Sequence, residues 1–308
     1  MTQPNIQHLI QAGDRQYARQ NFAQAVELYD KAYRLQSSHL NQVKLVQALH
    51  ANQQNKSAAT LISNYVTSYL KTYADTQLAV AVFLKLEDLI GAYQFVQNVT
   101  WHNDQQQQLL DQQIKQAAQT IATSHPQLLA RLSQRVLTIV TSPLSQQLEV
   151  VTRLHQLDLP DYLEQAKILV LHPYLHPLIK AGVMDDLVKL RLTEVVPLSF
   201  YGEMKTVVPN ELPIIANLQS LNALQQQLSS LQSQVGHNYE ALSGELNLYA
   251  AMLYPFTDQI ITDASFWLKM IMAKFGYKNT GKTLEKDLKA VKVNKWLSKF
   301  EELLSLFN

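Results

Sequence analysis

Residues that interrupt secondary structure are rare along this chain and leave long segments without a break. Only 8 Gly and 10 Pro are spread over its 308 residues, whereas an all-β protein carries turn signals roughly every 10 residues. Charged residues supply only 17% of the sequence, and Gln, which is a good helix former, provides much of the remaining polarity. The spacing of these residues therefore predicts a nearly all-α fold.

The segment AGDRQYARQNFAQAVELYDKAYRL, residues 12–35, carries small and aromatic residues at regular intervals. It resembles a tetratricopeptide repeat, which is a helix-turn-helix unit of about 34 residues. The matching positions are Gly13, Tyr17, Phe22, Ala25, Tyr29 and Ala32. The resemblance implies that Gly13 lets the two helices approach closely and that the aromatic pair flanks the turn. The chain departs from the family at Gln20, where a turn glycine is usual.

A second repeat follows when the pattern is moved along by one repeat length, to residues 41–66. Ala59 then stands in register with Ala25, while Gln47 and Lys56 replace the small and aromatic residues of the first repeat. Residues 78–99 keep the helical period and little of the motif. Because each repeat buries its apolar face against its neighbours, we expect more helices to follow.

Further helices are indicated by apolar residues spaced three and four apart within residues 125–140, 142–157, 159–171 and 176–192. The exception is the stretch 194–212, where β-branched and aromatic residues surround Gly202 and Glu203. A glycine at the first of two turn positions predicts a β-hairpin near 195–208, with Leu198 opposite Val207.

These patterns together predict an α-α superhelix of helical hairpins with one small β-hairpin insertion. We expect tetratricopeptide-like repeats over 1–100, further helical hairpins ending in the β-hairpin over 101–211, and a C-terminal helical region over 212–308. The segment that contains the hairpin is similar to the C-terminal part of tetratricopeptide proteins of unknown function from low-GC Gram-positive bacteria. That resemblance implies no activity.

Beyond the hairpin, Leu221, Leu224, Leu228, Leu231 and Val235 form a narrow apolar stripe along one predicted helix. The stripe covers about two heptads, which is short for a coiled coil with another chain. We therefore favour packing against the rest of the protein.

The octapeptide GYKNTGKT, residues 276–283, matches the phosphate-loop pattern of two glycines separated by four residues and followed by Lys and Thr. A phosphate loop needs a strand before its first glycine, but the apolar residues from Ile260 to Phe275 recur with helical spacing. Gly276 is then expected to end a helix, and Thr283 to begin the next one. The context favours a turn between helices over nucleotide binding.

Other signals of chemistry are weak, so we expect no enzymatic activity, no catalytic residue, no cofactor and no small-molecule substrate. The chain has no cysteine, which removes thiolate metal sites and cysteine nucleophiles. His172 and His176 have the spacing of two metal ligands on one helix, but a proline follows each of them. A structured turn between helices explains this pair better than a metal site.

The resemblance to tetratricopeptide repeats implies a protein partner bound by the first helices of the repeats. The candidate groove residues are Asp14, Tyr17, Asn41, Lys44, Ala48 and Asn52. Family members that bind the C-terminal carboxylate of a peptide have Lys and Asn at the positions of Ile10 and Asp14, so this ligand class is disfavoured here. Tyr17 could also pack within its own repeat.

A lysine-rich end supports the alternative of a nucleic-acid or anionic-membrane accessory protein. From Lys269 onward nine lysines face four acidic residues, so the tail has a charge of +5 and the remainder −4. The candidate basic surface comprises Lys282, Lys286, Lys289, Lys292, Lys295 and Lys299. A basic amphipathic helix that closes the helical array is the simpler interpretation.

The N-terminal segment lacks the features of a secretory signal, and no apolar stretch approaches the length of a membrane span. The sequence therefore predicts a cytoplasmic, non-catalytic scaffold or adaptor. It does not identify the partner or the oligomeric state.

Overall fold

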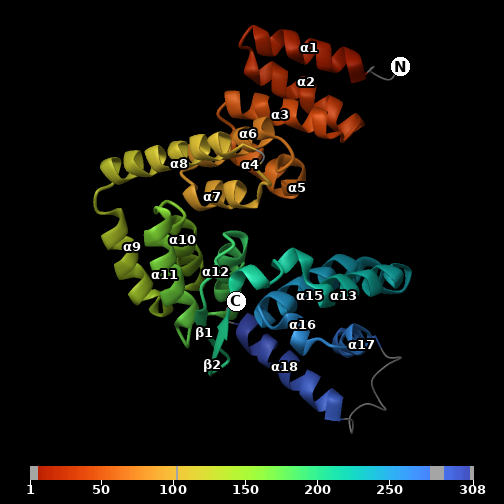
Figure 1. The fold of residues 1–308 in the computed structure, drawn as a ribbon. Helices are drawn as coiled ribbons and strands as arrows, with labels where there is room; N and C mark the ends of the chain where they lie inside the picture. Colours follow the sequence, from red (N-terminus) through yellow and green to blue (C-terminus); the bar gives the residue numbers. More distant parts are fainter. Residues whose placement is uncertain (1–5, 102, 278–287, 306–308) are drawn as a thin grey trace. The chain divides into compact units, whose positions relative to one another are not determined.

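Figure 1 shows a computed structural model of the chain, which describes residues 6–101, 103–277 and 288–305. The described residues are mostly helical, and their only strands form one two-stranded sheet, as expected for an all-α fold with a small hairpin. Two compact units are present. Unit 1 comprises Met1–Leu129 and His155–Tyr162, and unit 2 comprises Ala130–Leu154 and Leu163–Asn308. No helix among the described residues is long and apolar enough to cross a membrane.

Helix α8 (Asp104–Ser124) lies in unit 1 together with the helices that precede it. This helix buries Leu110, Ile114 and Ile121 and packs against α6 (Tyr73–Lys85) and α7 (Leu89–Asn98). Unit 1 therefore continues past residue 100.

Unit 1 begins with three consecutive helix pairs, which lie next to one another in Figure 1. The pairs are α1 (Ile6–Ala18) with α2 (Phe22–Leu35), α3 (His39–Ala51) with α4 (Asn55–Asn64), and α6 with α7. A short helix, α5 (Val66–Tyr69), connects the second pair to the third. The first helices begin at Ile6, His39 and Tyr73, which are 33 and then 34 residues apart.

The turn within each pair has the same backbone conformation. Gln20, Gln53 and Glu87 have φ values of 62°, 59° and 59°, in the left-handed region that favours glycine. Gln20 is thus a non-glycine residue in a conformation that favours glycine. The three pairs therefore share the conformation of the turn that follows their first helix.

The sequence alignment of the second repeat is wrong by one residue, because the first spacing is 33 rather than 34. Ala58, and not Ala59, is equivalent to Ala25, and both equivalent alanines are fully buried. Val46 likewise takes the place of Gly13, whereas Gln47 is exposed. A shift of one residue turns a helix by about 100°, so it exchanges buried and exposed positions.

The packing expected inside the first pair is confirmed. Ala25, Tyr29 and Ala32 are buried, and a Cβ atom on Gly13 would lie 2.6 Å from the Tyr29 ring. The rings of Tyr17 and Phe22 meet edge to face across the turn, with centroids 5.3 Å apart.

Unit 2 contains the remaining helices and the hairpin. Its principal helices are α9 (Leu128–Leu137), which starts at the unit boundary, α10 (Leu144–Leu154), α11 (Leu159–Leu171), whose first turn belongs to unit 1, α12 (Pro177–Lys189), α13 (Gln219–Ser230), α15 (Tyr239–Leu253), α17 (Ala264–Lys274) and α18 (Leu288–Leu304), with short helices α14 (Gln232–Val235) and α16 (Thr257–Ile260). Helix α13, which carries most of the apolar stripe, packs inside this unit against α15 and α17. Leu221, Leu224, Leu228 and Val235 are buried there.

The β-hairpin is confirmed, but its register differs from the expected one. Strands β1 (Val196–Phe200) and β2 (Glu203–Val207) pair Leu198 with Lys205 instead of Val207. The turn residues are Tyr201 and Gly202, with φ values of 49° and 87°, as in a type I′ turn. Tyr201 tolerates this conformation because its ring packs on Trp296 of α18 and its hydroxyl donates to the Met252 carbonyl over 3.1 Å.

Helix α17 ends as expected at Gly276, which has a φ of 85°. Gly276 N–H donates to the Ala273 carbonyl, and Tyr277 N–H donates to the Met272 carbonyl, which is the Schellman arrangement of a helix terminus. A helix and not a strand therefore enters the phosphate-like octapeptide. Residues 278–283 of that octapeptide lie outside the described residues.

Candidate functional site

The first helices of the three pairs share one face that is not buried. The equivalent positions are Gln7, Ile10, Asp14 and Tyr17 of α1, Leu40, Val43, Gln47 and His50 of α3, and Ala74, Gln77, Ala81 and Leu84 of α6. We call these twelve residues the first-helix face. All of them are exposed or half-buried, and Leu40 is 63% exposed.

Two predicted groove residues lie on the opposite side of α3, where they are buried. Asn41 is 3% exposed and its side-chain amide donates to the Gln36 carbonyl over 2.9 Å, and Ala48 is fully buried. The one-residue error in the repeat alignment explains this, because it moved the selected positions around the helix. Asn52 is half-buried at the C-terminus of α3. Asp14 and Tyr17 are exposed on α1.

Lys44 connects the first two helix pairs at the edge of the first-helix face. Its Nζ lies 2.6 Å from Asp14 Oδ1, which also accepts the Tyr29 hydroxyl over 2.6 Å. Partial burial opposes ionisation of Asp14, but the hydrogen bonds from Lys44 and Tyr29 outweigh it and hold the pKa of this carboxyl below its usual value. The charge of Asp14 is thus neutralised within the protein.

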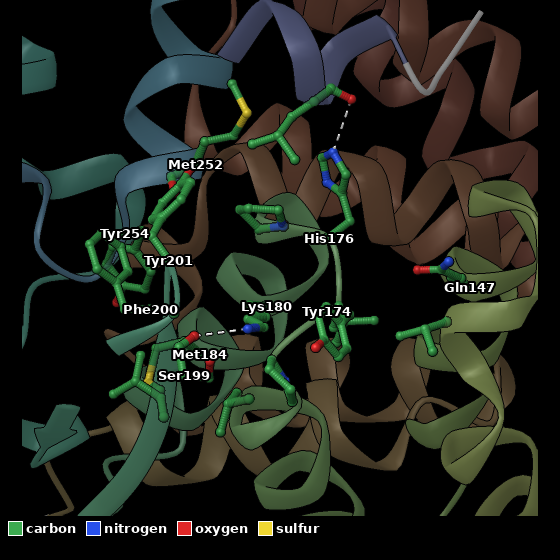
Figure 2. A pocket seen from close by; sticks show the side chains of 18 of the residues that line it. Gln147, Tyr174, His176, Lys180, Met184, Ser199, Phe200, Tyr201, Met252 and Tyr254 are labelled. Atoms are coloured by element: carbon green, nitrogen blue, oxygen red, sulfur yellow. Dashed lines mark hydrogen bonds between the residues drawn. The ribbon is translucent and has the colours of Figure 1, made fainter. Parts of the chain in front are cut away.

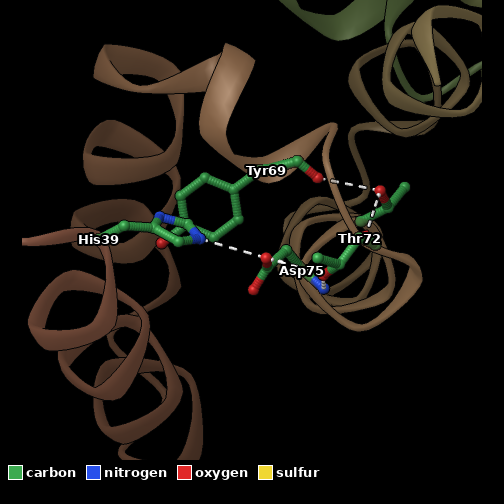
Figure 3. A network of polar contacts seen from close by, with 5 residues as sticks. His39, Tyr69, Thr72 and Asp75 are labelled. Atoms are coloured by element: carbon green, nitrogen blue, oxygen red, sulfur yellow. Dashed lines mark hydrogen bonds and ion pairs between the residues drawn. The ribbon is translucent and has the colours of Figure 1, made fainter. Parts of the chain in front are cut away.

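A second polar network connects α3 to α6, as shown in Figure 3. His39 Nε2 lies 3.1 Å from Asp75 Oδ2, and Thr72, the N-cap residue of α6, donates its hydroxyl to the same carboxylate. The His39 ring meets Tyr69 edge to face. This network and the Asp14–Lys44 pair give each first helix a specific polar contact with the next one.

The tail lysines do not form one uniform surface in the described part of the chain. Lys289, Lys292 and Lys295 are exposed along α18, whereas Lys299 is half-buried and pairs with Glu302 over 2.9 Å. Lys282 and Lys286 lie outside the described residues. The apolar side of α18 is buried at Ala290, Val293, Leu297 and Phe300.

The pair of histidines lies in the connection between α11 and α12, as expected from the prolines. His176 is the N-cap residue of α12, where its Nδ1 accepts the Leu178 N–H over 3.2 Å. Its Nε2 lies 3.3 Å from the Leu303 carbonyl, so both ring nitrogens have partners. Burial lowers the pKa of His176, and the Leu303 contact only partly opposes this. Among the described residues, no cluster of three or more metal-binding side chains is present.

Sequence reasoning missed a cavity of about 780 Å³ inside unit 2, shown in Figure 2. Its walls come from α10, the connection from α11 into α12, β1, the end of α15, and α18. Lys180 reaches this cavity from the first turn of α12 and donates to the Ser199 carbonyl over 2.8 Å. Burial lowers the pKa of Lys180 to about 8. Since Lys180 resembles any other helical lysine, the sequence contains no local signal of this environment.

Comparison of the chain with family models, with curated proteins and with solved structures finds no match. Its function is therefore inferred from the geometry of the first-helix face and of the cavity.

Proposed function

We propose that unit 1 is a non-catalytic, tetratricopeptide-like scaffold that binds an extended segment of a partner protein on the first-helix face. The observation that carries the proposal is the repeated turn conformation at Gln20, Gln53 and Glu87, together with the 33- and 34-residue spacing of the first helices. Regular spacing brings equivalent residues of successive helices to the same side. A surface of this kind suits a ligand that is itself a regular, extended chain.

The composition of the face indicates the chemistry of the partner segment. Of the twelve residues, only Asp14 has a permanent charge, and Lys44 already neutralises it. A charged ligand would therefore lose hydration without gaining an opposite charge. Gln47 and Gln77 offer both donors and acceptors, which match the N–H and C=O groups of a polypeptide backbone. Leu40 and Val43 offer aliphatic surface.

We therefore infer an uncharged, extended partner segment that contains aliphatic side chains. Burial of apolar area contributes roughly 25 cal/mol per Å², so the exposed leucine is the strongest single candidate contact. Because no net charge is involved, affinity should depend little on ionic strength.

The test is to select peptides from a random display library of extended 12-residue sequences on the full chain. We expect enriched peptides that are poor in Asp, Glu, Lys and Arg. Their dissociation constants should change less than about twofold between about 50 and 500 mM salt. Leu40→Asp should weaken binding at least about tenfold, which corresponds to about 1.4 kcal/mol.

Leu35→Asp is the matched control, because Leu35 is an exposed leucine of the same unit that lies on α2 and outside the first-helix face. It should leave the affinity nearly unchanged. The proposal fails if no peptide is enriched or if both aspartate variants act alike. Acidic peptides that dissociate with salt would instead support the alternative, in which Lys289, Lys292 and Lys295 of α18 bind an anionic partner.

A further inference from the structure

The cavity of unit 2 contains a lysine whose charge none of the described lining residues balances. Lys180 and Lys299 both line the cavity, and no Asp or Glu is among the lining residues that the structure describes. Lys299 has a partner in Glu302, whereas the hydrogen bond of Lys180 goes to the neutral Ser199 carbonyl. An ammonium group has three donors. Lys180 therefore keeps donor capacity and an uncompensated positive charge toward the cavity.

The remaining walls offer mainly apolar surface. Met184, Leu198 and Phe200 line the cavity, together with Tyr201 and Tyr254. The two tyrosine hydroxyls already donate to the Met252 and Pro213 carbonyls, so these residues present their rings to a ligand. The volume of about 780 Å³ lies within the range of small-molecule sites, roughly 300 to 1,000 Å³.

We propose that this cavity binds a small organic carboxylate with an apolar body. Lys180 pairs with the carboxylate, and the aromatic and aliphatic walls cover the apolar body. This site is independent of the scaffold proposed for unit 1, and it departs from the expectation that the protein has no small-molecule ligand.

The electrostatics of the cavity predict that ligand binding changes the pKa of Lys180. Burial disfavours the charged form of Lys180 and lowers its pKa to about 8. The other titratable groups that line the cavity are His176, Lys299, Tyr174, Tyr201 and Tyr254. His172 also senses the charge of Lys180, although burial is the main cause of its lowered pKa. Neither these histidines nor Lys299 would stabilise the ammonium, so a bound carboxylate would raise the pKa of Lys180.

The protein should therefore take up protons when the carboxylate binds. If the pKa of Lys180 returns toward its ordinary value of about 10.4, the complex takes up roughly 0.1 proton at pH 7 and roughly 0.9 at pH 9. Affinity should fall as the pH rises above 8, since the free protein then loses the ammonium.

Isothermal titration calorimetry of the full chain, in buffers of different ionisation enthalpy, tests the proposal. The probes are N-acetylphenylalanine, N-acetylleucine and N-acetyltryptophan, each compared with its primary amide, which lacks the charge. We expect at least one acid to bind with a dissociation constant below about 1 mM and at least about tenfold more tightly than its amide. In Lys180→Met the preference for the acid and the proton uptake should both disappear.

A further variant separates the ligand contact from folding. Lys189→Met is the matched control, because Lys189 lies on the same helix, pairs with Asp185 and does not line the cavity. It should bind like the wild type. Circular dichroism checks that each variant is folded.

The proposal is overturned if no acid binds, if acid and amide bind equally, or if folded Lys180→Met retains the proton uptake. The peptide selection on unit 1 has its own readout. The two proposals can therefore fail separately.

Discussion

The strain at the repeated turns gives a prediction with a defined sign. Gln53 has a φ of 59°, and Gln54, the next residue, has a φ of −86°. Both glutamines are exposed. A left-handed conformation costs a non-glycine residue about 1–2 kcal/mol, whereas glycine costs about 0.5–1 kcal/mol through the entropy of the unfolded chain. Gln53→Gly should therefore stabilise unit 1 by about 0.5–1 kcal/mol. Gln54→Gly should leave its stability nearly unchanged, because Gln54 is the N-cap residue of α4 and glycine is tolerated at that position.

The assay is urea unfolding, followed by hydrogen–deuterium exchange of peptides from α3 and α4 so that unit 1 is observed separately from unit 2. With a slope of about 2 kcal/mol/M, Gln53→Gly should raise the midpoint by about 0.3–0.5 M, whereas Gln54→Gly should shift it little. Gln20→Gly should behave like Gln53→Gly, and the double variant should be additive because the turns share no partner.

Glu87→Gly tests the same reasoning in a less favourable context. The Glu87 carboxylate accepts a hydrogen bond from the Gln156 amide over 2.6 Å. Removal of the Glu87 side chain loses this hydrogen bond while it relieves the backbone strain. Glu87→Gly should therefore stabilise unit 1 less than Gln20→Gly or Gln53→Gly does. If Gln53→Gly and Gln54→Gly destabilise unit 1 equally, the assignment of strain to the repeated turns is refuted.

Three other predictions concern packing and charge. Gly13→Ala should cost about 1–3 kcal/mol because the added Cβ overlaps an aromatic ring, while Gly182→Ala, which meets no atom within 4 Å, should gain up to about 1 kcal/mol in thermal unfolding. The stability of Lys180→Met relative to the wild type should be highest below pH 8 and should fall as the pH rises from about 8 to about 10.4, because the unfolded lysine binds the proton more tightly than the folded one in that window. Denaturation at pH 7, 8, 9 and 10 checks this, and a constant difference would contradict it. A double-mutant cycle with Asp14→Asn and Lys44→Met should give a coupling of about 0.5–1 kcal/mol that decreases with salt, since the pair is partly exposed.

The placement of the helices could be predicted from the sequence because it depends on local features. Few glycines and prolines interrupt the apolar periodicity, and most helix ends lie close to the expected positions. The close approach at Gly13 and the helix terminus at Gly276 also follow from residue type, since glycine alone combines a missing Cβ with freedom at positive φ. The location of the hairpin follows from its β-branched residues and its glycine.

Register could not be predicted in the same way, because it depends on contacts between elements. The 33-residue spacing of the first two helix pairs differs from the usual repeat length by one residue, and that difference moved Asn41 and Ala48 from the expected groove into the core. In the hairpin, Tyr201 occupies a turn position normally suited to Asn or Gly. Its contacts with Trp296 and Met252, which are distant in the sequence, compensate for that choice.

The sequence by itself thus determined the all-α class, the helix-pair unit and the position of the hairpin. Only the tertiary structure decided which side of each first helix remains accessible and where Lys180 lies. A lysine side chain in a helix has an ordinary pKa unless other segments of the fold exclude water from its ammonium group. In unit 2, α10, α15, α18 and β1 do this without contributing a carboxylate to the cavity, and such an environment is a property of the fold rather than of any local pattern.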